Sequence, residues 1–167
     1  MKNRVQKISP NLWFDHQAEE ATQHYVSIFK NSQIERITRY GAEKNDNHKF
    51  AEGAIMTVEF LLEGQHFVAL NGGPHFTFNE AISFIVHCET QEELNYYWEK
   101  LSEDGDEKAQ VCGWLKDKFG VSWQIVPANL SEMITDPDPA KSERVMKALL
   151  QTKSKIDMHV LHQAYEG

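Results

Sequence analysis

One design, a strand, a glycine turn and a second strand, occurs twice in this chain and restricts its possible folds more than any other feature. In residues 112–127, Gly120 supplies a turn position that can take a positive φ, and a β-branched and aromatic strand follows in residues 121–126. In residues 58–70, Gly64 occupies the place of Gly120. A hairpin that occurs twice predicts a chain built from two similar halves.

The segments before the two hairpins also match, without a gap, at an offset of 73 residues, so that Phe14 aligns with His87. Apolar residues recur at helical spacing in residues 18–29 and again in residues 92–101. Each half is therefore predicted to be βαβββ, with the weakest pattern for the third strand of the second half. Neither half would bury its helix and its sheet face alone, so we expect the halves to pack as a pair.

The pattern predicts an α+β domain at residues 1–130, built from modules at about 5–72 and 78–128, and a C-terminal helical extension at 131–167. In the extension, Asp138 is a predicted N-cap before Pro139, and Asp157 is a predicted N-cap for a second helix. The polar residues 41–49 predict a loop.

Composition excludes several partners. The net charge of −8 argues against binding to nucleic acid or to an anionic membrane surface. The chain has neither a run of 18 apolar residues nor an apolar leader at its N-terminus. Its two cysteines, Cys88 and Cys112, are outside any metal or redox motif and are predicted to be buried strand thiols. We expect a cytoplasmic protein.

The sequence resembles the PhnB-like branch of the vicinal oxygen chelate superfamily, which includes glyoxalase I, extradiol dioxygenases and bleomycin-resistance proteins. This branch is often labelled a 3-demethylubiquinone-9 3-methyltransferase domain. The segments that carry the resemblance are Ile8-Ser-Pro-Asn-Leu-Trp-Phe14, Ala18-Glu-Glu-Ala21 with Tyr25, Phe78-Asn-Glu-Ala-Ile-Ser83, Thr90-Gln-Glu-Glu93 with Trp98, residues 112–127, and the tail at 155–157 and 164–167. The resemblance implies paired βαβββ modules in a curved, incomplete barrel around a cavity, and a homodimer.

The resemblance also implies one divalent metal, held by His and Glu on the first and last strands of each module. The matching windows, residues 9–13, 67–71, 81–85 and 122–126, contain no His, Glu, Asp or Cys, and Gln124 stands at the position of the last-strand glutamate. Amides and hydroxyls alone are poor ligands for Zn²⁺ or Fe²⁺. We therefore predict no metal ligands and no cofactor, although a slip in register would bring in His66 and His87.

Five residues are candidates for binding a ligand, and none is identified as catalytic. Trp13, Trp114 and Trp123 could line an apolar pocket, while Asn71 and Gln124 could orient a ligand through their amides. The sequence favours a metal-free module that binds a small molecule. The alternatives are a metal-dependent lyase, isomerase or dioxygenase, or the methyltransferase of the family label, for which the chain lacks a glycine-rich nucleotide loop.

Overall fold

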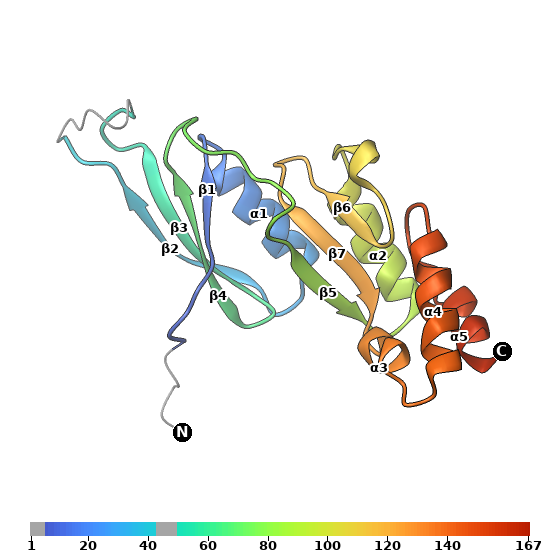
Figure 1. The fold of residues 1–167 in the computed structure, drawn as a ribbon. Helices are drawn as coiled ribbons and strands as arrows, with labels where there is room; N and C mark the ends of the chain where they lie inside the picture. The colour runs from blue at the N-terminus through green and yellow to red at the C-terminus, as the bar shows by residue number, and fades with distance from the viewer. Residues whose placement is uncertain (1–5, 43–49) are drawn as a thin grey trace, which may run out of the picture. The chain divides into compact units, whose positions relative to one another are not determined.

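The computed structural model describes residues 6–42 and 50–167, and the chain divides into two compact units, 1–78 and 79–167. The predicted loop at 41–49 lies almost entirely outside the described residues. The first unit contains β1 (Asn11–Phe14), α1 (Ala18–Ile28), β2 (Gln33–Arg39), β3 (Ile55–Leu62) and β4 (Gln65–Asn71). Its four strands have the order β1-β4-β3-β2 (Figure 1). Because β1 pairs in parallel with β4 and the other pairs are antiparallel, the sheet is mixed.

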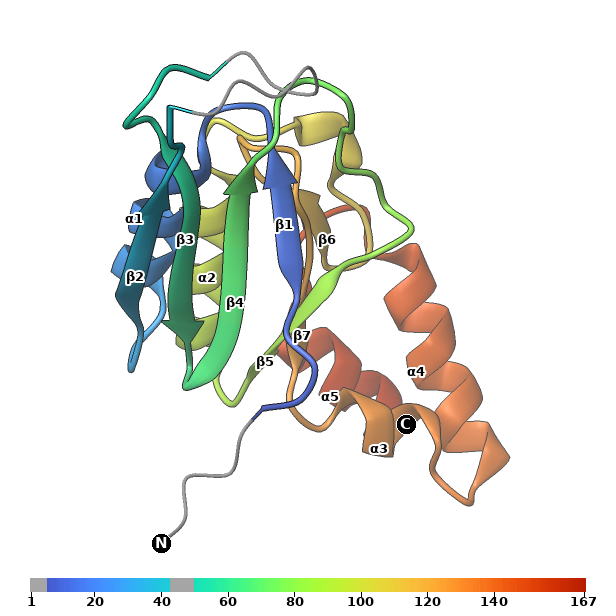
Figure 2. The same cartoon turned by 90° about the vertical axis from the view of Figure 1, so that its left-hand side faces the viewer.

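Helix α1 covers one face of the first sheet (Figure 2). Its buried residues recur at helical spacing, and Tyr25 is fully buried among them. On β3 the alternate residues Val58 and Phe60 are fully buried, as is Ala69 on β4. Alternation along a strand sends the intervening side chains to the opposite face, so only one face of this sheet belongs to the helix-packed core.

The second unit repeats this topology with β5 (Phe84–Cys88), α2 (Gln91–Ser102), β6 (Trp114–Lys116) and β7 (Ser122–Pro127). The strand order is β5-β7-β6, with β5 parallel to β7 as β1 is to β4. The predicted repeat is confirmed in its connectivity, and Gly64 and Gly120 both take positive φ, 75° and 86°. Neither sheet closes into a barrel, and the fold is α+β with C-terminal helices.

Two details of the predicted repeat were wrong. The second unit has two strands after α2 where the βαβββ pattern has three, and the described residues between α2 and β6 form a 3₁₀ turn (Glu107–Ala109) capped by the Asp106 side chain. This acidic, polar segment lacks β-branched residues, as is typical of a loop, so the missing strand has no counterpart here. The gap-free alignment also fails in the first strand. The buried, helix-facing Phe14 corresponds to the buried Cys88 and not to the exposed His87, because the turn before α1 is one residue longer than the turn before α2.

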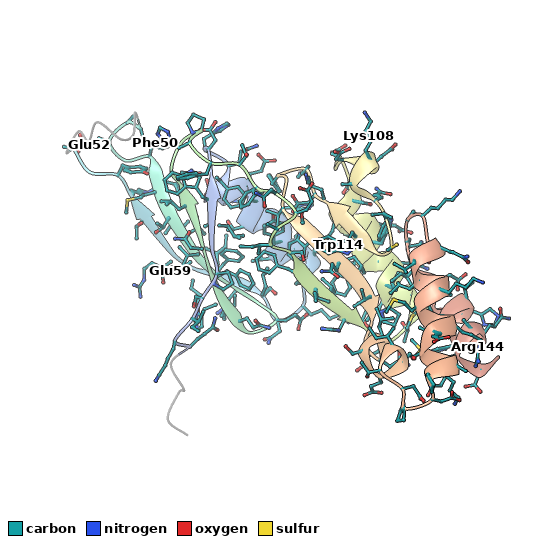
Figure 3. The ribbon with its side chains drawn as sticks, viewed as in Figure 1. Phe50, Glu52, Glu59, Lys108, Trp114 and Arg144 are labelled. Carbon is teal, nitrogen blue, oxygen red and sulfur yellow. The ribbon has the colours of Figure 1, made fainter. Side chains whose placement is uncertain are left out.

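The C-terminal residues form α3 (Leu130–Ile134), α4 (Pro139–Gln151) and α5 (Met158–Glu166), of which α3 was not predicted. Both predicted caps are confirmed, because Asp138 accepts a hydrogen bond from the Ala140 amide and Asp157 accepts one from the His159 amide. Arg144, labelled in Figure 3, donates through Nε to the Ala164 carbonyl at 2.7 Å. None of the described helices combines the length and apolar character needed to cross a bilayer.

Cys112 lies in a tight turn and not in the predicted strand. Its φ is +51°, followed by +83° at Gly113, which matches a two-residue hairpin turn between Val111 and Trp114. The amides of Cys112 and Gly113 donate to the carbonyls of Thr152 and Ser154, at 3.0 and 2.9 Å. The segment between α4 and α5 is therefore hydrogen-bonded directly to the turn that precedes Trp114.

Candidate functional site

The first sheet places Trp13 on the face that does not pack against α1, which we call the α1-distal face. Trp13 is in register with Leu70 on β4, and Leu70 is in register with Thr57 on β3. All three side chains are partly exposed. Their neighbours Leu12 and Phe14 are buried on the α1 side. An aromatic ring and an aliphatic side chain therefore adjoin on this face.

The Trp13 ring is held in place by several contacts. Its Nε1 donates to the Gly73 carbonyl at 2.9 Å, and its ring lies edge-on to Phe76 with centroids 5.0 Å apart. Phe76 is 65% exposed. Sequence reasoning missed Phe76 because an isolated aromatic residue in a loop carries no periodic signal. Together, Trp13 and Phe76 offer an ordered aromatic surface suited to an apolar ligand.

Asn71 lies at the end of β4 on the opposite, α1-facing side, and it is 5% exposed. Its Oδ1 accepts a hydrogen bond from the Ala18 amide at 2.9 Å, and its Nδ2 donates to the Ile55 carbonyl at 3.1 Å. Gln17, at the N-cap position of α1, makes no side-chain capping bond. Asn71 thus caps α1 from a distant strand, and the structure does not bring it together with Trp13.

Replacing Asn71 with alanine is expected to lower the free energy of unfolding by about 2 kcal/mol, because the buried Ala18 amide and the half-buried Ile55 carbonyl both lose the bond to this side chain. The Asn71→Asp variant keeps an acceptor for the Ala18 amide and adds a negative charge at the helix N-terminus. Its free energy of unfolding should therefore fall less than that of Asn71→Ala. Urea unfolding followed by circular dichroism measures both. Equal stability of wild type and Asn71→Ala would contradict the capping role.

The second sheet brings Trp114 and Gln124 together on the face opposite α2, the α2-distal face. Gln124 on β7 is in register with Trp114 on β6 and with Ile85 on β5, so the three side chains form one cross-strand row. Ile85 is 51% exposed. The Gln124 Nε2 donates to the Ser83 Oγ at 2.9 Å, which fixes the amide relative to the row. Figure 3 labels Trp114 on this sheet.

Trp123 points to the other side of the same sheet and is 3% exposed. It is in register with Phe84 and Leu115, and its Nε1 donates to the Asp117 Oδ2 at 2.9 Å. The other oxygen of this buried carboxylate accepts from the amides of Phe119 and Val121, both at 2.9 Å. The structure therefore places Trp123 in the core beneath the hairpin turn, separate from Trp114 and Gln124.

Two polar residues extend the α2-distal face beyond Gln124. Ser122 precedes Gln124 by two residues and is in register with Lys116 on β6. The Nζ of Lys116 is paired with the carboxylate of Glu80, and the hydrogen bond from Lys116 lowers the pKa of Glu80. Ser122 is 2% exposed, and its Oγ has no hydrogen-bond partner in the described part of the chain. Sequence reasoning did not identify Ser122 or Lys116 as site residues, since polar residues in a strand usually face solvent.

The side chains on the two distal faces do not fit a catalytic metal. The matching positions on the first and last strands present Trp13, Leu70, Ile85 and Gln124 there, none of which is an imidazole, thiolate or carboxylate. By strand alternation His66 and His87 also lie on these faces, one on each sheet. Across residues 6–42 and 50–167, no group of three or more His, Cys, Asp and Glu side chains could hold a metal ion. The Nδ1 of His66 is already 2.9 Å from a carboxylate oxygen of Glu35.

The two thiols differ in their surroundings. Cys88 is fully buried, as predicted, and burial raises its pKa to about 12, so it stays protonated at neutral pH. Cys112 is half-buried in its turn, with Sγ 3.3 Å from the Thr152 carbonyl oxygen. A buried thiol with a raised pKa is a poor nucleophile, which leaves Cys88 with a packing role.

Comparison with known proteins gives a family match over most of the chain. Residues 6–126 match the family model described as 3-demethylubiquinone-9 3-methyltransferase. The tail segments 155–157 and 164–167 lie outside that match. No curated protein matches the chain.

Solved structures give the same result. A PhnB protein from Bacillus cereus, named for a 3-demethylubiquinone-9 3-methyltransferase, is 38% identical, with a TM-score of 0.63 over 74% of this chain and 100% of that chain. A Pseudomonas aeruginosa protein is 19% identical, with a TM-score of 0.56 over 71% of this chain and 95% of that chain, and supports the fold alone.

Proposed function

Because the chain belongs to the PhnB-like 3-demethylubiquinone-9 3-methyltransferase family of glyoxalase-fold proteins, we propose that it binds a small aromatic or apolar molecule without using a metal. The observation that carries the proposal is the cross-strand row of Ile85, Gln124 and Trp114 on the α2-distal face. This row combines an apolar side chain, an aromatic ring and an oriented amide, which is the composition of a small-molecule site.

The first sheet supports the same function with a second aromatic surface. Trp13 and Phe76 are ordered by their mutual contact and by the bond from Trp13 to the Gly73 carbonyl. Exposed aromatic side chains cost free energy in water, and covering them with a ligand recovers about 25 cal/mol for each Å² of apolar surface. We further propose that the protein acts as a cytoplasmic homodimer.

Gln124 supports binding without a metal. This neutral amide occupies the position of the metal-ligating glutamate in the superfamily that the sequence resembles, and its Nε2 donates to Ser83. A carboxylate would be needed to neutralise and hold a divalent cation at this place. The amide instead suits a neutral partner, bound through hydrogen bonds.

The test combines metal analysis with ligand screening on the purified, tag-free protein. We expect less than stoichiometric Zn, Fe, Mn and Ni by plasma mass spectrometry, a dimer by native mass, and stabilisation by aromatic compounds in thermal unfolding. One tightly bound equivalent of metal would overturn the metal-free function. Saturable binding of S-adenosylmethionine, with no response to aromatic compounds, would favour the methyltransferase.

A further inference from the structure

We propose that the polar end of the α2-distal face, formed by Ser83, Ser122 and Gln124, is a subsite for a neutral amide edge. The ligand is therefore an aromatic carboxamide or lactam, whose ring lies against Trp114 and Ile85. This assignment rests on the proposed function, since it names the chemical class of ligand that the same face would bind.

The first argument is the unused capacity of the Gln124 side chain. A primary amide has two N–H donors and one carbonyl acceptor. One donor of Gln124 is used by the Ser83 Oγ, while its Oε1 has no hydrogen-bond partner among the described residues. Gln124 thus retains an acceptor and a second donor side by side. A ligand that presents an adjacent N–H and C=O can satisfy both at once.

The second argument is the buried hydroxyl of Ser122. Leaving a buried polar group without a partner costs about 1–3 kcal/mol. Ser122 is 2% exposed and its Oγ is unpaired in the described part of the chain. It lies on the same face as Gln124, two residues before it along β7. A polar atom of a water or of a ligand would complete the hydrogen bonding of the Ser122 hydroxyl and so account for its burial.

The third argument is the charge around the subsite. Lys116 is the cation opposite Ser122, and Glu80 already neutralises it. A carboxylate ligand would therefore displace Glu80 or bind without a counter-charge, in a chain whose net charge is already −8. Hydroxyls and an amide are donors and acceptors for a neutral group. This charge balance favours a carboxamide over a carboxylate.

The experiment is a titration of the ¹⁵N-labelled full chain with benzamide, benzoate and toluene, observed by NMR. We expect benzamide to shift the Gln124 side-chain NH₂ signals and the Trp114 indole signal with saturation. Benzoate and toluene should bind at least about tenfold more weakly, since each lacks part of the donor–acceptor pair. Equal affinity for all three probes would overturn the amide subsite but leave the apolar function intact. No saturable shift at Trp114 or Gln124 with any probe would overturn both.

Two variants separate binding from folding. Gln124→Met keeps the side-chain length but removes the amide, and it should abolish the preference for benzamide over toluene. Ser122→Ala removes the unpaired hydroxyl, so it should leave the thermal midpoint unchanged or raise it, while benzamide affinity falls about three- to tenfold. A lowered midpoint with unchanged benzamide affinity would show that Ser122 acts only in folding, and would overturn its place in the subsite.

Discussion

Replacing Asp117 with alanine is expected to destabilise the protein by about 3 kcal/mol or more, the largest loss that we predict for a single side chain. Asp117 is 3% exposed, and its carboxylate accepts hydrogen bonds from the amides of Phe119 and Val121 and from the Trp123 indole. Alanine would remove the shared acceptor of these three donors at a site with little access to water. The same change should shift the Trp123 indole N–H signal in an NMR spectrum, because this N–H loses its acceptor.

Two further variants define the cause. Asp117→Asn keeps one oxygen acceptor but places an N–H₂ group among donors, so it should recover only part of the loss. Asp106→Ala is the matched control. Asp106 also accepts from a backbone amide, that of Lys108, but in an exposed 3₁₀ turn, and its loss should cost about 1 kcal/mol or less. Denaturant unfolding measures all three. If Asp117→Ala cost no more than Asp106→Ala, the buried carboxylate would not stabilise the hairpin.

The connectivity of both units could be predicted because it depends on patterns that the chain repeats. Helical spacing before a glycine hairpin occurs in each half, and positive φ at Gly64 and Gly120 follows from the turn alone. Among its described residues, the second unit has no strand that corresponds to β2, and the repeat alone could not predict this absence. The acidic segment between α2 and β6 forms a 3₁₀ turn instead, which depends on the Asp106 cap.

The candidate site was harder to predict because it depends on which face of a strand a residue occupies. A shift of one residue moves every side chain to the other face. The single extra residue in the turn before α1 produces such a shift between the two halves, so Phe14 corresponds to Cys88. Asn71 and Gln124 are both strand amides, yet one caps a helix and the other lies beside Trp114. Sequence spacing alone does not separate these roles.

Replacing Gly72 with alanine is expected to destabilise the first unit by about 3 kcal/mol and to displace the Trp13 ring. A Cβ at Gly72 would lie 2.2 Å from Cζ2 and 2.3 Å from Cε2 of Trp13. The ring cannot easily move aside, because its Nε1 is bonded to the Gly73 carbonyl and its edge meets Phe76. Denaturant unfolding gives the loss of stability, and the indole N–H signal of Trp13 in an NMR spectrum reports the displacement of the ring.

A double-mutant cycle identifies the ring as the cause. In a Trp13→Leu background the space beside Gly72 is open, so Gly72→Ala should then cost less than about 0.5 kcal/mol. Gly72, unlike Gly53 at φ +82°, is not among the glycines with positive φ, so backbone strain does not account for its loss. Additive effects of the Gly72 and Trp13 substitutions would contradict the close approach. Non-additive effects would mean that Gly72 is required because the Trp13 ring occupies the space of a Cβ atom. Any loss of aromatic-ligand binding in Gly72→Ala would then come from the displaced ring.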